Sequence, residues 1–465
     1  MSDYFLYMKS EWLVTLIIFL LLLIKIGKGM SNGMLLSIVQ FLLLLSVIVG
    51  FFFNGKSELF DGMFRTDPSI AFQKNILAVG VYLITLLFSD WLKKNQNLAE
   101  YLVLMLASLL GMYFMISSGN LLMFYLSMEL SSIPVAAMAN FDLDRKASSE
   151  AAMKLILSSA FSSGVLLFGI SIVYGVTGSI AFSELANYTT QSPLLLVGFV
   201  FLFTGFAFKL SIVPFHLWTA DVYEGAPAIT SSFLSAISKG SIAFIFTITL
   251  YRVFGSLEAV WHQMLVVLSV ATMIIGNLFA MRQQNMKRFL AFSSIAQVGF
   301  ILVGMSSHTA AGNSAVIYFI LIYIFSNLAA FGIVSVIFER TGKEKIDDYK
   351  GLYQTNPFLS CIMALALFSL AGIPPTAGFF GKLFLLTAGA SAGNYWFITI
   401  AALNMIISLY YYLRVVRSVF MEHNDQPLEK IQTNPASAFA LTICAVAIVL
   451  VGLMSWIYGY IDSLH

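Results

Sequence analysis

Long apolar stretches recur along almost the whole chain and are separated by short polar connections. Each stretch is close to the roughly 20 mostly apolar residues that a membrane-spanning helix needs. The pattern therefore predicts an all-α, polytopic membrane protein of about fourteen transmembrane helices. The expected helices span residues 12–27, 34–53, 74–92, 99–117, 119–139, 152–177, 193–216, 228–252, 261–281, 287–305, 312–338, 357–390, 394–420 and 437–460.

Two of these helices should be broken within the membrane. Helix 7 contains Pro214, and helix 12 contains Pro374 and Pro375 and is too long for one straight span at about 1.5 Å per residue. Proline removes a backbone donor and clashes with the preceding helical turn. Unwound backbone at membrane depth persists only where it is buried in protein or lines water. Both breaks therefore indicate candidate functional sites.

The spacing of the two breaks indicates an internal repeat. They lie five helices apart, so matching helices cross the membrane in opposite directions, as in the inverted repeats of many transporters. We expect helices 4–8 and helices 9–13 to be the two five-helix copies. The chain is then one membrane domain, made of three N-terminal helices (1–98), a first repeat (99–252), a second repeat (261–420) and a C-terminal helix (437–460).

The basic residues predict the orientation. Of the 25 lysines and arginines, sixteen fall in connections on one side of the predicted membrane, and four lie within helices. Cytoplasmic loops carry an excess of Lys and Arg, so the side with sixteen should face the cytoplasm and both termini should lie on the other side. That other side carries Lys9, Lys56, Arg65, Lys74 and Arg252.

The composition excludes several classes of function. The chain is 59% hydrophobic and 10% charged, whereas soluble domains carry about 25% charged residues. A net charge of +2 is too small to suggest nucleic acid. Cys361 and Cys444 lie far apart, without Cys-x-x-Cys or Cys/His spacing, and no glycine-rich phosphate loop is present. We therefore expect no metal and no cofactor bound by this chain.

Three lysines interrupt the apolar runs: Lys209, Lys239 and Lys382. A lone ammonium at membrane depth costs at least about 3 kcal/mol, so such residues are usually retained for a function. Lysines in a dry interior can hold, lose and regain protons, and we predict this role for all three. The alternative for Lys239 and Lys382 is a packing role among the small residues around them.

Three further ionisable residues are candidates for the same site. Glu129 lies about ten residues into its helix, and a buried glutamate either pairs with a cation or stays protonated, so Lys209 is its expected partner. Lys154 follows Glu150 by four residues near a helix end, where an interfacial pair is as reasonable as a deep role. His216 lies two residues after Pro214 and either relays protons or caps the broken helix.

Several segments together resemble the antiporter-like membrane subunits of respiratory complex I. They cover roughly residues 100–420 and are too long to match by chance. The matching segments are Ser149–Lys154, Phe208–Trp218, Asp221–Pro227, Asn285–Gly299 and Ala371–Lys382.

The resemblance implies a role for each candidate residue. Glu129 and Lys209 resemble the pair formed between helices 5 and 7, Lys239 the central lysine of helix 8, Lys382 the helix 12 group nearest the outer exit, and Lys154 the helix 6 lysine. The implied function is proton translocation in a bacterial inner-membrane NADH:quinone oxidoreductase. NADH, FMN, iron–sulfur clusters and quinone are then expected in partner subunits.

Other functions share parts of this pattern. Subunits of multisubunit cation/proton antiporters and of membrane-bound hydrogenases carry the same signatures. A passive scaffold in a membrane complex and a free-standing transporter are further alternatives. The partners that copurify with the chain, and the effect of replacing Lys239, would distinguish them.

Overall fold

A computed structural model describes residues 2–27, 30–52, 54–190, 192–391, 393–424 and 428–464. Within these ranges, twelve helical spans are long and apolar enough to cross a membrane. Two further crossings are α2 (Lys9–Ile26) and the pair of shorter apolar helices α18 (Pro357–Ala371) and α19 (Ala377–Ser391). The predicted all-α architecture of about fourteen crossings is therefore confirmed.

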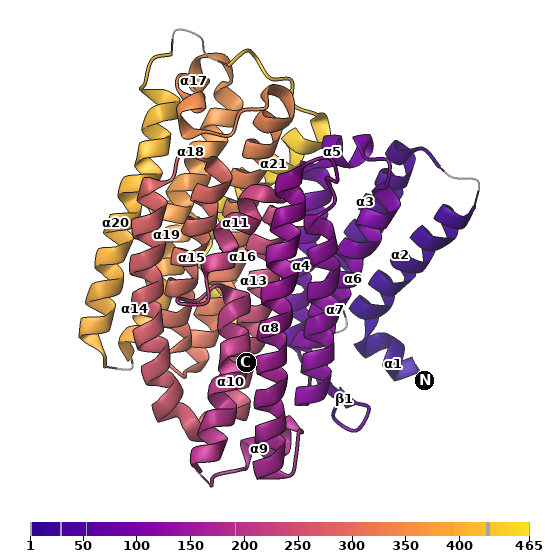
Figure 1. The fold of residues 1–465 in the computed structure, drawn as a ribbon, viewed down its shortest axis with the longest axis vertical. Coiled ribbons are helices and arrows are strands. Elements are labelled where there is room, and N and C mark those ends of the chain that lie inside the picture. The colour runs from indigo at the N-terminus through magenta and orange to yellow at the C-terminus, as the bar shows by residue number, and fades with distance from the viewer. Residues whose placement is uncertain are drawn as a thin grey trace.

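The N-terminal part of the chain forms one edge of the helical bundle (Figure 1). A short antiparallel hairpin, in which Glu58 pairs with Arg65, precedes the third crossing. That crossing begins earlier than expected, because the Asp67 carboxylate accepts a hydrogen bond from the backbone N–H of Ile70 at 2.7 Å and caps it. The elements are α1 (Ser2–Tyr7), α2, α3 (Asn32–Gly50), β1 (Ser57–Leu59), β2 (Phe64–Thr66), α4 (Pro68–Leu87) and α5 (Ser89–Lys94).

One residue of α4 corrects the sequence analysis. Lys74, counted there among the residues at a membrane surface, is buried inside α4. Its ammonium lies 2.5 Å from the carboxylate of Glu11 on α2, and both side chains are 3% exposed. Burial of such a pair is costly unless the two charges are matched, and here each supplies the counter-charge of the other.

The following helices contain the first half of the predicted repeat. Crossing 8 is one continuous helical path, but two π-helical segments interrupt its α-helical hydrogen bonding. The elements are α6 (Leu98–Ile116), α7 (Leu121–Ala139), α8 (Lys146–Thr177), α9 (Phe182–Ala186), α10 (Pro193–Leu210), α11 (Leu217–Gly225), α12 (Ala228–Ser232), η1 (Phe233–Ser238), α13 (Lys239–Ile248) and η2 (Thr249–Val253).

The remaining helices contain the second half and the C-terminal crossing. Side-chain caps fix several helix starts, as where Thr309 accepts from the backbone N–H of Gly312 at 3.0 Å. The elements are η3 (Gly255–Leu257), α14 (Glu258–Arg282), α15 (Met286–Met305), α16 (Ala310–Thr341), η4 (Ile346–Tyr349), α17 (Leu352–Thr355), α18, α19, α20 (Tyr395–Phe420), α21 (Pro435–Leu453) and α22 (Ser455–Asp462).

The two predicted helix breaks have the same local structure. After α10, Ser211 adopts a left-handed conformation, and the N–H groups of Ser211 and Ile212 bond back to Phe208 and Ala207 at 3.0 and 2.8 Å. After α18, Gly372 is left-handed, and Gly372 and Ile373 bond back to Ser369 and Phe368 at 3.1 and 3.0 Å. Both arrangements are Schellman motifs, and a proline follows the left-handed residue by three positions in each.

A second correspondence joins the two halves. Gly111 of α6 lies against the backbone nitrogen of Ser131 on α7, and Gly276 of α14 lies against that of Ala296 on α15. The same 165-residue spacing separates Gly111 from Gly276 and Ser131 from Ala296. A side chain at either glycine would collide with the neighbouring helix, so close packing of each helix pair needs glycine at this position. The matched breaks and matched glycines support the expected inverted repeat, which stays a prediction.

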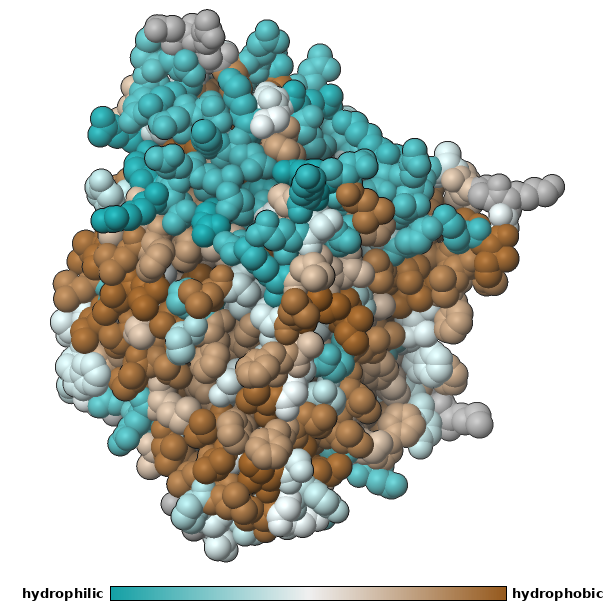
Figure 2. All heavy atoms as spheres, in the orientation of Figure 1, coloured by the Kyte–Doolittle hydropathy of each residue, from teal (hydrophilic) through white to brown (hydrophobic). Residues whose placement is uncertain are grey.

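The bundle has a protein-enclosed centre and an apolar outer surface. Figure 1 shows α16 in the middle of the bundle. Of an 18-residue apolar segment in α16, 89% is buried, against 33% of the corresponding segment in α8, and both helices are 32 residues long. Hydrophilic residues gather over the end that carries α5 and α17, and apolar residues cover most of the sides (Figure 2). Both termini lie toward the opposite end, where α9 and β1 are found.

Candidate functional site

Lys209 lies in the last turn of α10, immediately before the first helix break. Its ammonium donates to the hydroxyls of Ser132 on α7 and Ser159 on α8, at 2.6 and 2.7 Å. A cavity of about 20 Å³ adjoins it, also lined by Ser238 of η1. That volume suffices for one water molecule between Lys209 and Ser238.

Glu129 lies near Lys209 without touching it. Among the described residues no hydrogen bond or ion pair joins the two, yet the charge of Glu129 acts on Lys209. One carboxylate oxygen of Glu129 is buried and has no hydrogen-bond partner among those residues. Glu129 and Ser132 are three positions apart on α7 and share a face, so a small movement of the ammonium would exchange the hydroxyl for the carboxylate.

Lys239 is the first residue of α13 and follows directly after the π-helix η1. It is 3% exposed, donates to the hydroxyl of Ser294 on α15 at 2.8 Å, and lies 5.5 Å from the centre of the Tyr223 ring. π-Helical turns within α-helices are rare and are found mainly at functional sites. The described residues place no carboxylate within 4.0 Å of this ammonium.

Lys382 is fully buried on α19, just past the second break. Its ammonium donates to the backbone carbonyls of Leu370 and Ala371, at 2.7 and 3.2 Å, and lies 4.6 Å from the centre of the Phe300 ring. Those carbonyls end α18 and have no partner within their own helix. The lysine therefore caps the negative end of the α18 dipole.

Two residues of α15 take part in the contacts of Lys239 and Lys382. Ser294 accepts from Lys239, and Gln297, one turn further along the same face, donates to the carbonyl of Leu370 at 2.8 Å. Lys382 donates to that same carbonyl. Side chains of α15 thus contact Lys239 at one position and the carbonyl that holds Lys382 at another, and no hydrogen bond joins Ser294 to Gln297 among the described residues. Sequence reasoning did not single out Ser294 or Gln297, although both stand in the matching segment Asn285–Gly299 as polar residues in an apolar helix.

His216 occupies the N-cap position of α11, at the end of the first break. Its side chain makes no capping hydrogen bond. The structure therefore does not support the alternative prediction that the His216 side chain caps the broken helix. The residue is 8% exposed, its Nδ1 has no hydrogen-bond partner among the described residues, and the charge of Lys239 acts on it.

Lys154 belongs to a different cluster, on the hydrophilic end of the molecule. Its ammonium lies 2.7 Å from both Glu150 and Asp221, and Arg288 lies 2.8 Å from both Asp221 and Glu224. These groups surround a cavity of about 340 Å³. Partial burial opposes ionisation of Asp221, but hydrogen bonds from Lys154 and Arg288 outweigh it and hold the Asp221 pKa below its usual range. The structure thus places Lys154 in a partly exposed ion-pair network with Glu150 and Asp221.

The described residues contain no group of three or more His, Cys, Asp or Glu side chains that could hold a metal ion. The chemistry available at this site is therefore that of amines, hydroxyls, one carboxylate and one imidazole. Such groups can pass protons along hydrogen bonds.

Comparison with known proteins gives consistent matches. A family model described as NADH:quinone oxidoreductase/Mrp antiporter, TM, matches residues 118–408. The chain is 47% identical to NADH-quinone oxidoreductase subunit N of Azobacteroides pseudotrichonymphae, over 89% of this chain and 87% of the relative. It is 42% identical to subunit N of Phocaeicola vulgatus, over 98% of both.

Solved structures share the fold. A chain of respiratory complex I from Thermus thermophilus with bound Aureothin has a TM-score of 0.83 and 26% identity, covering 96% of this chain and 97% of that one. A chain of the Mrp complex from Dietzia has a TM-score of 0.88 over 98% and 96%. At 19% identity, the second match is evidence of fold alone.

Proposed function

Because this chain belongs to the NADH:quinone oxidoreductase and Mrp antiporter family of transmembrane proteins, we propose that it is a proton-translocating membrane subunit of an NADH:quinone oxidoreductase. The resemblance to antiporter-like subunits of complex I is thereby confirmed. Relatives named subunit N match the chain over most of their own length and favour this function over that of a separate cation/proton antiporter.

The observation that carries the proposal is the set of polar contacts around the buried lysines. On α15, Ser294 accepts from Lys239, and Gln297, three residues later, donates to the Leu370 carbonyl that also accepts from Lys382. Among the described residues neither lysine has a carboxylate within 4.0 Å. A buried amine without a fixed counter-charge can exist with or without its proton, which a translocating group requires.

The mechanism follows the order of these groups. Lys209 exchanges its serine partners for Glu129 and so takes up or gives up a proton as the pair closes or opens. The proton passes by water in the water-sized cavity and His216 to Lys239, and then by water beside Ser294 and Gln297 to Lys382, which releases it to the outer side. Moving one charge against about 180 mV costs about 4 kcal/mol. We assign that work to electron transfer from NADH through FMN and iron–sulfur clusters to quinone in partner subunits.

Position in the membrane is part of the same proposal. The hydrophilic end with α5 and α17 faces the cytoplasm of a bacterium, and the end that carries the termini faces outward across the inner membrane (Figure 2). The excess of basic residues at the first end supports this orientation. Residues 99–252 and 261–420 act as the two repeat units around the lysines.

The test is Lys239→Ala in the assembled complex, with NADH oxidation and proton translocation measured in membrane vesicles. Loss of a positioned proton-transfer group should lower proton translocation by about 100-fold. Lys343→Ala, on an exposed loop, is the control and should change neither rate. Unchanged translocation by the Lys239 variant would instead support the passive scaffold. Copurification of antiporter or hydrogenase subunits, without NADH-oxidising partners, would favour those alternatives.

A further inference from the structure

A cluster of uncharged polar side chains lies close to Lys239 and takes no part in the proposed proton transfers. Ser235 of η1 and Tyr323 of α16 share a hydrogen bond of 3.1 Å between their hydroxyls. The amide nitrogen of Asn327, one turn further along α16, donates to both hydroxyls at 2.9 Å. These three residues, the Tyr323 cluster, are each at most 5% exposed.

The cluster adjoins the hydrogen-bond acceptor of Lys239. Ser294 of α15 accepts from the ammonium at 2.8 Å, and it is also close enough to act on the Tyr323 hydroxyl. Gly240, the residue after Lys239, lets α16 approach, because a Cβ at this position would lie 3.0 Å from Ile320 of α16. The Tyr323 hydroxyl and the ammonium are therefore neighbours of one serine.

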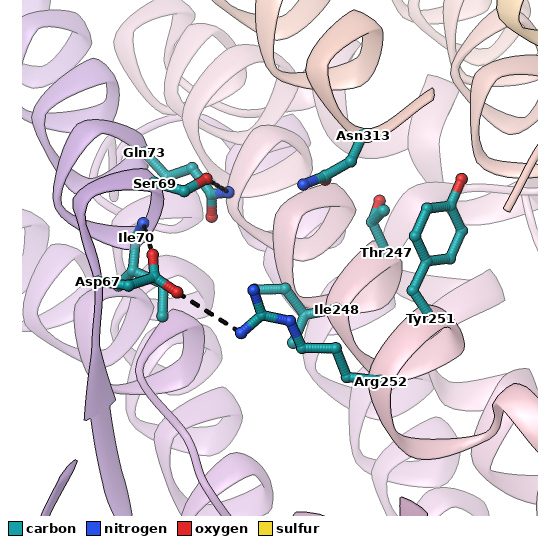
Figure 3. Close-up of a pocket in the computed structure, with 9 residues that line it drawn as sticks. All are labelled: Asp67, Ser69, Ile70, Gln73, Thr247, Ile248, Tyr251, Arg252 and Asn313. Atoms are coloured by element: carbon teal, nitrogen blue, oxygen red, sulfur yellow. Dashed lines mark hydrogen bonds and ion pairs between the residues drawn. The ribbon is translucent and has the colours of Figure 1, made fainter. Parts of the chain in front are cut away.

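The charged groups at the far end of α13 are too distant to serve Lys239. Figure 3 shows them around a cavity of about 40 Å³, where Arg252 lies 3.5 Å from Asp67. Thr247, on the α13 side of that cavity, is eight residues beyond Lys239, about 12 Å along the helix axis. A buried charge without a counter-charge depends on the dipoles that directly surround it.

Two further side chains face Lys239 from the first break and α11. The ammonium lies 5.5 Å from the centre of the Tyr223 ring, and its charge acts on His216. The Tyr223 hydroxyl is buried, has no hydrogen-bond partner among the described residues, and lies near Ser294 as well. Tyr223, Tyr323 and His216 are the titratable side chains that the described residues bring to this lysine, and none is a carboxylate.

The Tyr323 cluster can be hydrogen-bonded in two ways without movement of any heavy atom. One hydrogen lies between the oxygens of Ser235 and Tyr323, and either hydroxyl can supply it. When Tyr323 donates, its oxygen keeps a lone pair that stabilises a nearby positive charge. When Ser235 donates, the Tyr323 hydrogen is free to point toward Ser294. The two arrangements match a lysine with its proton and a lysine without it.

We propose that the Tyr323 cluster positions hydroxyl dipoles for Lys239 and thereby sets the pH range over which this lysine holds a proton. Dipoles that reverse take the place of a fixed counter-charge. Tyr323 is a positioning residue, which neither takes up nor releases the proton itself. The inference rests on the proposed function, because it concerns the protonation of a translocating lysine, and it extends the site to α16.

The first test is the pH dependence of proton translocation by Tyr323→Phe in the assembled complex. Initial translocation rates per NADH oxidised are measured in membrane vesicles between about pH 6 and pH 9. Loss of a dipole disfavours the charged amine more than the neutral one, so the alkaline limb of the profile should move to lower pH by about one unit. Tyr318→Phe is the matched control, because it is similarly buried on α16 but donates to the Val451 carbonyl at 3.0 Å. Its profile should match that of the native complex.

The second test removes the other hydroxyl. In Ser235→Ala the Tyr323 hydrogen loses its acceptor and turns toward Ser294, the arrangement that suits the neutral amine. We expect the alkaline limb to move in the same direction, and the double variant with Tyr323→Phe to move no further than Tyr323→Phe alone, because the two hydroxyls act as a unit. Ser241→Ala is the control, since this buried hydroxyl donates only to the carbonyl of Ser238.

Profiles of Tyr323→Phe and Ser235→Ala that coincide with the native profile would overturn the inference. Equal shifts in the two controls would also overturn it, because they would show a general response to lost hydroxyls. If Tyr323→Phe does not assemble, the profile of Ser235→Ala decides. Failure of the proposed function would be seen separately, as normal translocation by Lys239→Ala.

Discussion

The ammonium of Lys382 and the side-chain amide of Gln297 donate to one backbone oxygen, that of Leu370, at 2.7 and 2.8 Å. The shared oxygen ends α18, so it joins the second helix break to α15. Through Ser294, α15 also holds Lys239. A change at this single carbonyl therefore acts directly on Lys382 and, through Gln297, on the helix that holds Lys239.

Replacing Gln297 should interrupt this connection. In Gln297→Leu the side chain keeps its bulk but loses both donors, which leaves Lys382 on its two carbonyls and Tyr412 without the amide bond at 2.9 Å. We expect proton translocation per NADH oxidised to fall about tenfold, since positioned proton-transfer groups contribute this much or more. Gln284→Leu, exposed in the connection between α14 and α15, is the control. Equal translocation by Gln297→Leu and the native complex would exclude a route along α15.

The Glu11–Lys74 pair should control stability of the N-terminal edge. Lys74→Met leaves the Glu11 carboxylate buried without its counter-charge, which typically costs about 3–5 kcal/mol. The double variant Glu11→Gln, Lys74→Met removes both charges and should recover most of that loss. Titration of the purified chain in detergent with a denaturing surfactant measures the difference in the free energy of unfolding between the variants. A double variant as unstable as Lys74→Met would show that the pair is not matched in the way the structure indicates.

Asp221 should make the network around Lys154 sensitive to acid. Its pKa in the folded protein is below the usual value, so its stabilising contribution is complete above about pH 5 and is lost as the pH falls through the lowered pKa. The thermal unfolding midpoint should therefore fall between about pH 5 and pH 3 in the native protein. Asp221→Asn should have a lower midpoint at neutral pH and a smaller fall over the same range. Parallel midpoint curves for the two proteins would contradict this prediction.

Gly378 should tolerate no side chain. An added methyl group would overlap the carbonyl oxygen of Ser369, where α19 begins against the end of α18. Gly378→Ala should separate the two half-helices and destabilise the protein by about 1–3 kcal/mol, as overpacking does. Gly175→Ala is the matched control, because this glycine lies within α8 with open space around its Cα, and it should be neutral or slightly stabilising. Unfolding midpoints and proton translocation of both variants check the prediction.

The sequence was enough to predict the crossings and both breaks, because apolar length and proline act locally. It also identified Lys209, Lys239 and Lys382 as charged residues within the predicted membrane helices, since a charge in an apolar run is visible without a structure. The partners of these lysines could not be predicted: Ser294, Gln297 and the carbonyl of Leu370 come from helices that meet only in three dimensions. For the same reason Lys74 was assigned to a surface, because Glu11 is more than sixty residues away.

The expected contact between Glu129 and Lys209 illustrates a different limit. Charge complementarity predicts that the two residues pair, but the structure has Ser132 and Ser159 as the hydrogen-bond partners of the lysine. Small hydroxyl side chains carry little signal in an apolar sequence. Which of several nearby acceptors a flexible lysine adopts depends on packing details that no pattern encodes.

The burial of α16 determines which helices experience the surrounding lipid. With nearly all of its surface against protein, α16 can carry Tyr323, Ser326 and Asn327 at mid-membrane depth without meeting acyl chains. α8 and α20 have most of their surface on the outside of the bundle, so changes in bilayer thickness should act on them first. Acyl-chain length should therefore alter the tilt of the outer helices first, while the polar side chains that α16 carries keep their geometry.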